Sequence, residues 1–141
     1  MKAKWWAALM LGAGLVVGVP VLANGVMGSD APSRIPVPAR DFTAKVEDVG
    51  GTAVQLGRFT FNGEVFIYGK FGAGQVTVHF EDITEARIEK ASDPLKRIVV
   101  IKTKAGETVR VELDDDTPFF GKASFGNYKI LVRDLRVVRF P

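Results

Sequence analysis

The stretch that decides the fold is FIYGKFGAGQVTVHFEDITEARI, residues 66–88, because a related stretch, PFFGKASFGNYKILVRDLRVVRF, follows at residues 118–140. The two align without gaps at an offset of 52 residues, and the match extends upstream to residues 58 and 110. The identical pairs are Arg58/Arg110, Gly69/Gly121, Lys70/Lys122, Gly74/Gly126, Asp82/Asp134 and Arg87/Arg139. Most of the remaining pairs are conservative. We therefore predict two related halves, roughly residues 41–90 and 96–140.

From Asp41 onward, the dominant spacing between apolar residues is two. Val76 and Val78 alternate with polar residues, and Val109 and Val111 do the same. Successive side chains of a strand point to opposite faces, so this spacing predicts half-buried antiparallel strands. No stretch of helical spacing is long enough to predict a helix of ordinary length.

A half of about four strands leaves both edges and one apolar face in water, and such a sheet is not stable alone. Two halves remove the problem by facing each other or by closing into a barrel. The predicted fold is therefore all-β. It is a small antiparallel β-barrel or β-sandwich of about eight strands, with its halves related by a pseudo-twofold axis.

Residues 1–23 have the layout of a secretory signal peptide. Lys2 and Lys4 precede an apolar run that begins at Trp5, and Val21-Leu22-Ala23 offers small residues before a cleavage point. The alternative is an uncleaved membrane anchor, which the glycines and the proline of the run disfavour. Residues 24–40 contain three prolines and two glycines, which predicts a flexible leader. Residues 41–141 then form the duplicated domain.

The charge and the cysteine content limit the setting and the partners. Two of the 19 basic residues lie in the predicted signal peptide, which leaves 17 basic and 16 acidic residues and a net charge of +1. This near balance argues against a nucleic-acid partner. The chain has no cysteine, so an exported form relies on its apolar core rather than on disulfides. We expect a bacterial periplasm or cell exterior, with membrane contact only if the signal peptide is retained.

The residues capable of chemistry do not form a recognisable catalytic or metal site. His79 is the single histidine, and a zinc site needs several His or Cys ligands. Asp114-Asp115-Asp116 lacks the alternating ligand spacing of a calcium loop. Ser124 lies two residues from Lys122, a spacing that can suit a Ser–Lys pair, but the first copy has Gly72 at the matching position. We expect no enzyme, no metal and no cofactor.

The repeated residues are interpreted as structural. Glycine tolerates sharp bends, so the repeated glycines are expected to turn the chain into the following strand. Asp82 and Asp134 each end a strand, where a carboxylate can accept N–H groups of the following turn. These aspartates are also expected to pair with the repeated arginines, namely Arg58, Arg87, Arg110 and Arg139.

The function expected from this pattern is a non-catalytic interaction or structural module. It binds another protein, or a second copy of itself, through sheet edges or a strand face. The candidate contact residues are the basic residues Lys129, Arg133 and Arg136, with Leu131 between them.

The alternative function is a carrier for a lipid or another small apolar molecule, because a barrel of about eight strands can enclose one small ligand. Seven phenylalanines are available to line such a cavity: Phe59, Phe61, Phe66, Phe71, Phe119, Phe120 and Phe125.

Overall fold

The computed structural model describes residues 31–141. The predicted signal peptide and the first part of the predicted leader lie outside the described residues. One compact unit spans Arg34–Pro141, so residues 34–40 belong to the same unit as the strands. Within the described part of the chain, no helix is long and apolar enough to cross a membrane.

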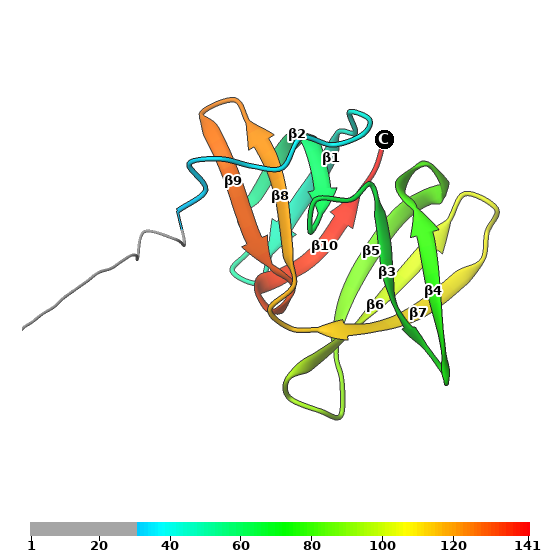
Figure 1. The fold of residues 1–141 in the computed structure, drawn as a ribbon. Helices are drawn as coiled ribbons and strands as arrows, with labels where there is room; N and C mark the ends of the chain where they lie inside the picture. The colour runs from blue at the N-terminus through cyan, green and yellow to red at the C-terminus, as the bar shows by residue number, and fades with distance from the viewer. Residues whose placement is uncertain (1–30) are drawn as a thin grey trace, which may run out of the picture. The chain divides into compact units, whose positions relative to one another are not determined.

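The described residues form ten strands and two short 3-10 turns (Figure 1). The strands are β1 (Ala44–Asp48), β2 (Ala53–Phe61), β3 (Phe66–Phe71), β4 (Gly74–His79), β5 (Ile83–Lys90), β6 (Lys96–Thr103), β7 (Thr108–Asp114), β8 (Pro118–Ala123), β9 (Gly126–Leu131) and β10 (Leu135–Arg139). The turn η2 (Phe80–Asp82) joins β4 to β5, and the turn η3 (Val132–Asp134) joins β9 to β10.

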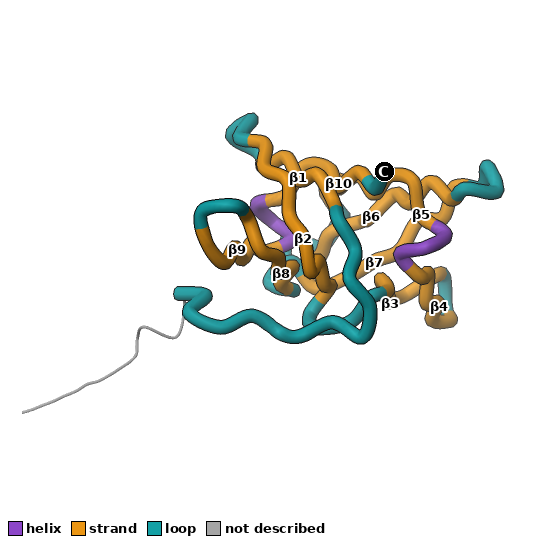
Figure 2. The backbone as a smooth tube through the Cα atoms, turned by 90° about the horizontal axis from the view of Figure 1, so that it is seen from above, coloured by secondary structure: helices purple, strands orange, loops and turns teal. Residues whose placement is uncertain are grey.

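All ten strands belong to one sheet in the order β4-β3-β7-β6-β5-β10-β1-β2-β8-β9, and the sheet curls into a half-barrel (Figure 2). Every pairing between neighbours is antiparallel. The prediction of an all-β antiparallel fold is confirmed. The sheet differs from the predicted barrel or sandwich of about eight strands, because ten strands curl as one sheet around their shared apolar face.

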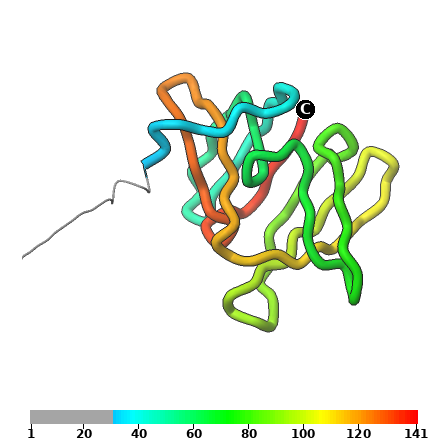
Figure 3. Tube along the Cα trace, in the orientation of Figure 1, coloured from blue at the N-terminus to red at the C-terminus, as the bar shows by residue number. Residues whose placement is uncertain are grey.

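The strand order divides at its centre into two groups of five (Figure 3). The contiguous group contains β3 to β7, residues 66–114. The split group combines β1 and β2, residues 44–61, with β8 to β10, residues 118–139. Both groups cross the boundary between the predicted halves, since β6 and β7 pair with strands of the first half.

The core is one hydrophobic cluster with aromatic rings at its centre. Phe59 is fully buried, and its ring centroid lies 5.4 Å from that of Phe80 and 5.3 Å from that of Phe119. Phe119 comes from β8 and lies in the split group with Phe59, whereas Phe80 comes from η2 within the contiguous group, so the Phe59–Phe80 contact joins the two groups. Phe140, beyond the last strand, adds a further ring 5.8 Å from Phe59.

The repeated glycines have two different roles. Gly74 and Gly126 each begin a strand, as predicted for bends, but Gly69 and Gly121 lie inside β3 and β8. A Cβ atom at Gly69 would lie 2.5 Å from the carbonyl oxygen of Glu112, and one at Gly121 would lie 2.7 Å from the Cβ of Leu56. The prediction of a bend is therefore wrong at these two positions, where glycine permits close approach of a neighbouring strand.

Asp82 and Asp134 end the two 3-10 turns, but they act through their backbone. The N–H of Lys104 donates to the carbonyl oxygen of Asp82 at 2.8 Å, and the N–H of Val49 donates to that of Asp134 at 2.9 Å. No side-chain hydrogen bond caps either turn. Backbone hydrogen bonds thus anchor both described turns to neighbouring hairpin loops, and the structure does not show the predicted carboxylate caps in either of them.

Three of the four repeated arginines pair with glutamates rather than with these aspartates. Arg87 and Arg139 lie 3.2 and 3.4 Å from the carboxylate of Glu85, and Arg110 lies 3.0 Å from that of Glu89. Because β5 and β10 are neighbours, Arg139 reaches Glu85 across the centre of the sheet. Arg58 has a positive φ of 48°, at the point where the register between β2 and β8 shifts. The sequence match of Arg58 to Arg110 does not predict this backbone conformation.

Candidate binding site at the edge of β4

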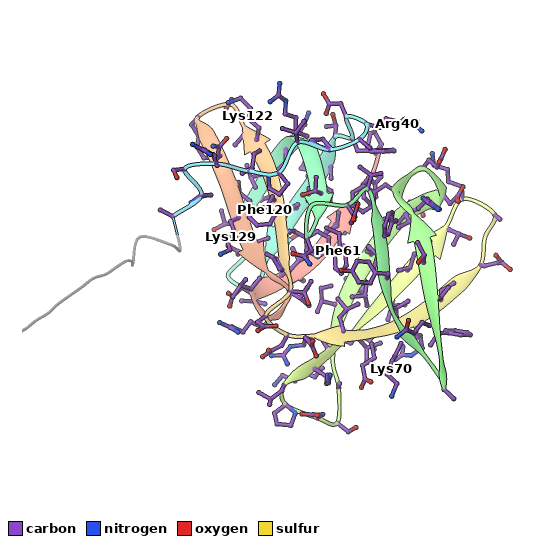
Figure 4. All side chains as sticks on the ribbon, in the orientation of Figure 1. Arg40, Phe61, Lys70, Phe120, Lys122 and Lys129 are labelled. Carbon is purple, nitrogen blue, oxygen red and sulfur yellow. The ribbon has the colours of Figure 1, made fainter. Side chains whose placement is uncertain are left out.

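The structure distributes the predicted contact residues over three elements. Lys129 (Figure 4) and Leu131 lie on β9. Arg133 lies in η3, and Arg136 lies on β10. The Arg136 guanidinium donates to the carboxylate of Glu47 and to a backbone carbonyl, both at 2.9 Å. Arg133 lies 3.9 Å from a carboxylate oxygen of Asp115. Two of the three basic side chains are therefore already engaged within the chain.

The repeated lysines also fail to form one site. Lys70 lies on β3 and Lys122 on β8, in hairpins at opposite ends of the described molecule (Figure 4). Both side chains are exposed. Ser124 lies in the turn after Lys122, at the tip of the β8–β9 hairpin.

The seven phenylalanines proposed to line a carrier cavity have different environments. Phe59, Phe61 and Phe119 are buried against one another, whereas Phe71 and Phe125 are exposed at hairpin tips. The remaining two, Phe66 and Phe120, are half-buried. The seven phenylalanines that motivated the carrier alternative are thus divided among the core, the hairpin tips and half-buried positions.

Strand β4 is one edge of the described sheet, and it lacks the usual protection of an edge. Its sequence, Gly74-Gln75-Val76-Thr77-Val78-His79, contains no proline, lysine or acidic residue. Its pairing with β3 is continuous from Gly74 to His79, without a bulge. Natural edge strands are commonly blunted by charge, proline or bulges, because an edge presents unpaired N–H and C=O groups to other chains.

Two grooves border β4. The larger has a volume of about 730 Å³, and Gln75, Val76 and Thr77 line it together with residues of β3. The smaller has a volume of about 270 Å³, and Thr77 and Val78 line it together with Val109 of β7. Thr77 lines both grooves, and Val76 and Val78 each line one of them, so depressions adjoin the strand at each position from Gln75 to Val78 and leave room for side chains of an added strand.

Lys96 carries the best-defined ion pair of the larger groove. Its Nζ lies 2.6 Å from an Oδ atom of Asp114, and the hydrogen bond and charge of Asp114 raise the pKa of Lys96 above its usual value. A raised pKa means that the pair contributes to stability below the unfolded-state pKa of Lys96, and that this contribution is lost as the pH rises through the folded-state pKa.

We expect Asp114→Asn to return the pKa of Lys96 toward its usual value. Titration of the Lys96 side chain by NMR measures this change directly. Asp116→Asn is the control, because Asp116 is not among the groups that shift the pKa of Lys96. If the two variants titrate identically, the ion pair assigned here is wrong.

The edge of β4 can interact with another chain through its backbone N–H and C=O groups and through its apolar and polar side chains. His79 is exposed, and its ring lies 5.5 Å from the ring of Phe66. Among residues 31–141, no three His, Asp or Glu side chains are grouped so as to hold a metal ion. Sequence reasoning missed this site, although the absence of charge from residues 74–79 was readable as a signal.

The chain belongs to the protein family described as "Uncharacterised protein", whose family model matches residues 38–141. The matched range includes every strand of the sheet. No curated protein matches the chain, and no solved structure matches it.

Proposed function

We propose that this protein is an exported, non-catalytic interaction module that binds an extended segment of protein chain as an added strand beside β4. The observation that carries the proposal is an edge strand without lysine, arginine or acidic residues that is bordered by two grooves. In this mode of recognition, backbone hydrogen bonds supply affinity and depressions for alternate side chains supply specificity. Export rests on the signal-peptide layout of residues 1–23.

The size of the edge limits the affinity of the proposed interaction. Strand β4 has six residues, so an added strand forms only a few backbone hydrogen bonds. Each contributes about 0.5–1.5 kcal/mol net. An interface of this size belongs with small, transient contacts unless further surface joins it.

We further infer that the two halves of the chain arose by duplication and are related by a pseudo-twofold axis. Three matched pairs of elements support this: the bounds of β3 and β8, of β4 and β9, and of η2 and η3 differ by 52 residues. Ala86 pairs with Val138, also 52 residues apart, at the centre of the sheet. Under this relation β9 corresponds to β4, but it carries Lys129 where β4 carries Thr77.

A photo-crosslinking amino acid at Gln75 tests the proposed function in cells that make the protein. We expect a discrete adduct from Gln75, because its exposed side chain lies on the edge strand. Lys102 is the control, since it is also exposed but lies on β6, where it is paired with Glu85 of β5 on one side and with Thr108 of β7 on the other. No adduct from Gln75, or equal adducts from both positions, contradicts binding at this edge.

A further inference from the structure

We propose that the strand added beside β4 is β4 of a second copy of this chain, paired antiparallel about a twofold axis at Thr77. This inference rests on the proposed function and names its partner. It follows from the sequence of the edge, from the environment of its valines and from the contrast with β9.

The sequence of β4 is self-complementary in this register. Thr77 faces Thr77 of the second copy, Val76 faces Val78, and Gln75 faces His79. Opposed Thr–Thr pairs and aliphatic pairs both stabilise antiparallel strands, and no like charges are opposed. A twofold interface requires one surface to complement itself, and Val-Thr-Val reads the same in both directions. Facing residues of two antiparallel strands form either a hydrogen-bonded or a non-hydrogen-bonded pair, and both kinds of pair can lie on a twofold axis. The proposed register is therefore possible whichever kind of pair the two Thr77 residues form.

The valines explain what a second copy contributes to the edge. Val76 is half-buried and Val78 is 9% exposed, and both point to the inner face of the sheet with Ile67 of β3. In the paired dimer, Val76 of the second copy lies beside Val78, where the smaller groove is also lined by Val109. Four valines thus cover one another across the axis, on the face where a depression is available.

The opposite end of the sheet does not offer the same pairing. Strand β9 has Lys129 at the position that matches Thr77, so the same register opposes two lysines. Directly opposed like charges destabilise a strand pair. In this register, self-pairing is therefore expected at β4 and not at β9. Because the interface uses the same patch on both copies, the assembly closes as a dimer.

Introduced cysteines test the register, because the chain has no cysteine of its own. In Thr77→Cys the two facing Cα atoms lie about 4.5–5.5 Å apart, a separation that a disulfide accepts. In Gln75→Cys the two equivalent residues are offset by four positions, about 13 Å along the strands, which is too far. Gln75→Cys faces His79→Cys instead.

We expect Thr77→Cys to form a disulfide dimer at least about tenfold faster than Gln75→Cys, because only the former meets its own copy within disulfide range. A mixture of Gln75→Cys and His79→Cys should give the mixed dimer in preference to either homodimer. Thr52→Cys, in an exposed turn, measures the rate of random collisions. Equal rates for all variants overturn the proposal, as does absence of the mixed dimer.

Sedimentation of the protein without cysteine provides an independent measurement. We expect Thr77→Lys to weaken the dimer by about fivefold or more, because it opposes two lysines at the axis. Thr52→Lys makes the same chemical change away from β4 and should leave the association unchanged. Unchanged association in Thr77→Lys, or equal weakening in both variants, contradicts pairing through β4.

The experiments distinguish strand addition beside β4 from pairing with a second copy. If Gln75 crosslinks in cells to a different protein while the cysteine register test fails, strand addition stands and the second copy is wrong as the partner. If Gln75 gives no adduct in cells and the cysteine test also fails, both proposals are overturned.

Discussion

Phe59→Ala is expected to lower the free energy of unfolding by about 3–5 kcal/mol. The ring of Phe59 is fully buried and contacts three other rings, those of Phe80, Phe119 and Phe140. Truncation removes these contacts and leaves a cavity between the contiguous and split groups. Because a whole domain is commonly stable by about 5–15 kcal/mol, this one change leaves the protein close to unfolding. Urea denaturation measures the effect.

Phe125→Ala is the matched control for this prediction. The side chain of Phe125 is 80% exposed at the tip of the β8–β9 hairpin, so its removal should change stability by less than about 0.5 kcal/mol. Similar losses for the two variants would show that Phe59 does not occupy the packed position described here.

Gly69→Val is the second variant with a large expected effect, a loss of about 1–3 kcal/mol or more. Even the Cβ atom of an added side chain meets the carbonyl oxygen of Glu112 at 2.5 Å and Val111 Cγ1 at 2.7 Å. A backbone carbonyl cannot move aside without separating β3 from β7. These strands are registered through a single pair, Lys70 with Glu112, and such a separation would break it. Thermal unfolding measures the loss.

Gly74→Ala, in the same hairpin, tests whether the effect belongs to the close approach. Its added Cβ atom lies 3.7 Å from the nearest atom, a backbone oxygen of Phe71, which is an ordinary contact. We therefore expect little change in stability. Gly69→Ala adds the same single Cβ atom as Gly74→Ala, at 2.5 Å from the carbonyl oxygen of Glu112. The assigned role of Gly69 is wrong if these two alanine variants unfold at the same temperature.

The strands were predictable from sequence because burial on one face of a strand is a local pattern. Val76 and Val78, and Val109 and Val111, show the alternation directly. The pairing order was not predictable in the same way. The contacts of β10 with β5 and of β7 with β3 join distant residues, and no local pattern specifies which strands become neighbours.

The candidate site was harder to predict for the same reason. The lack of charge in β4 is visible in the sequence, but its position at an edge depends on the whole strand order. Gly69 illustrates the ambiguity at single residues, since glycine serves equally at a bend and at a close approach. Asp82 adds a different ambiguity, because a sequence does not tell whether its carboxylate or its carbonyl accepts the hydrogen bond.

The unequal connectivity of the two groups has a consequence for the order in which the chain assembles. In the contiguous group, three of the four pairings join consecutive strands, whereas in the split group β1 and β2 await partners from the far end of the chain. Closing a longer loop costs more entropy, and folding slows as contacts become less local. During synthesis the N-terminal part of the chain appears first. Strands β1 and β2 therefore appear before the other described strands and are among the last to pair with all of their neighbours. The interval before β8 and β10 arrive is the period in which the nascent protein most needs protection from aggregation and proteolysis.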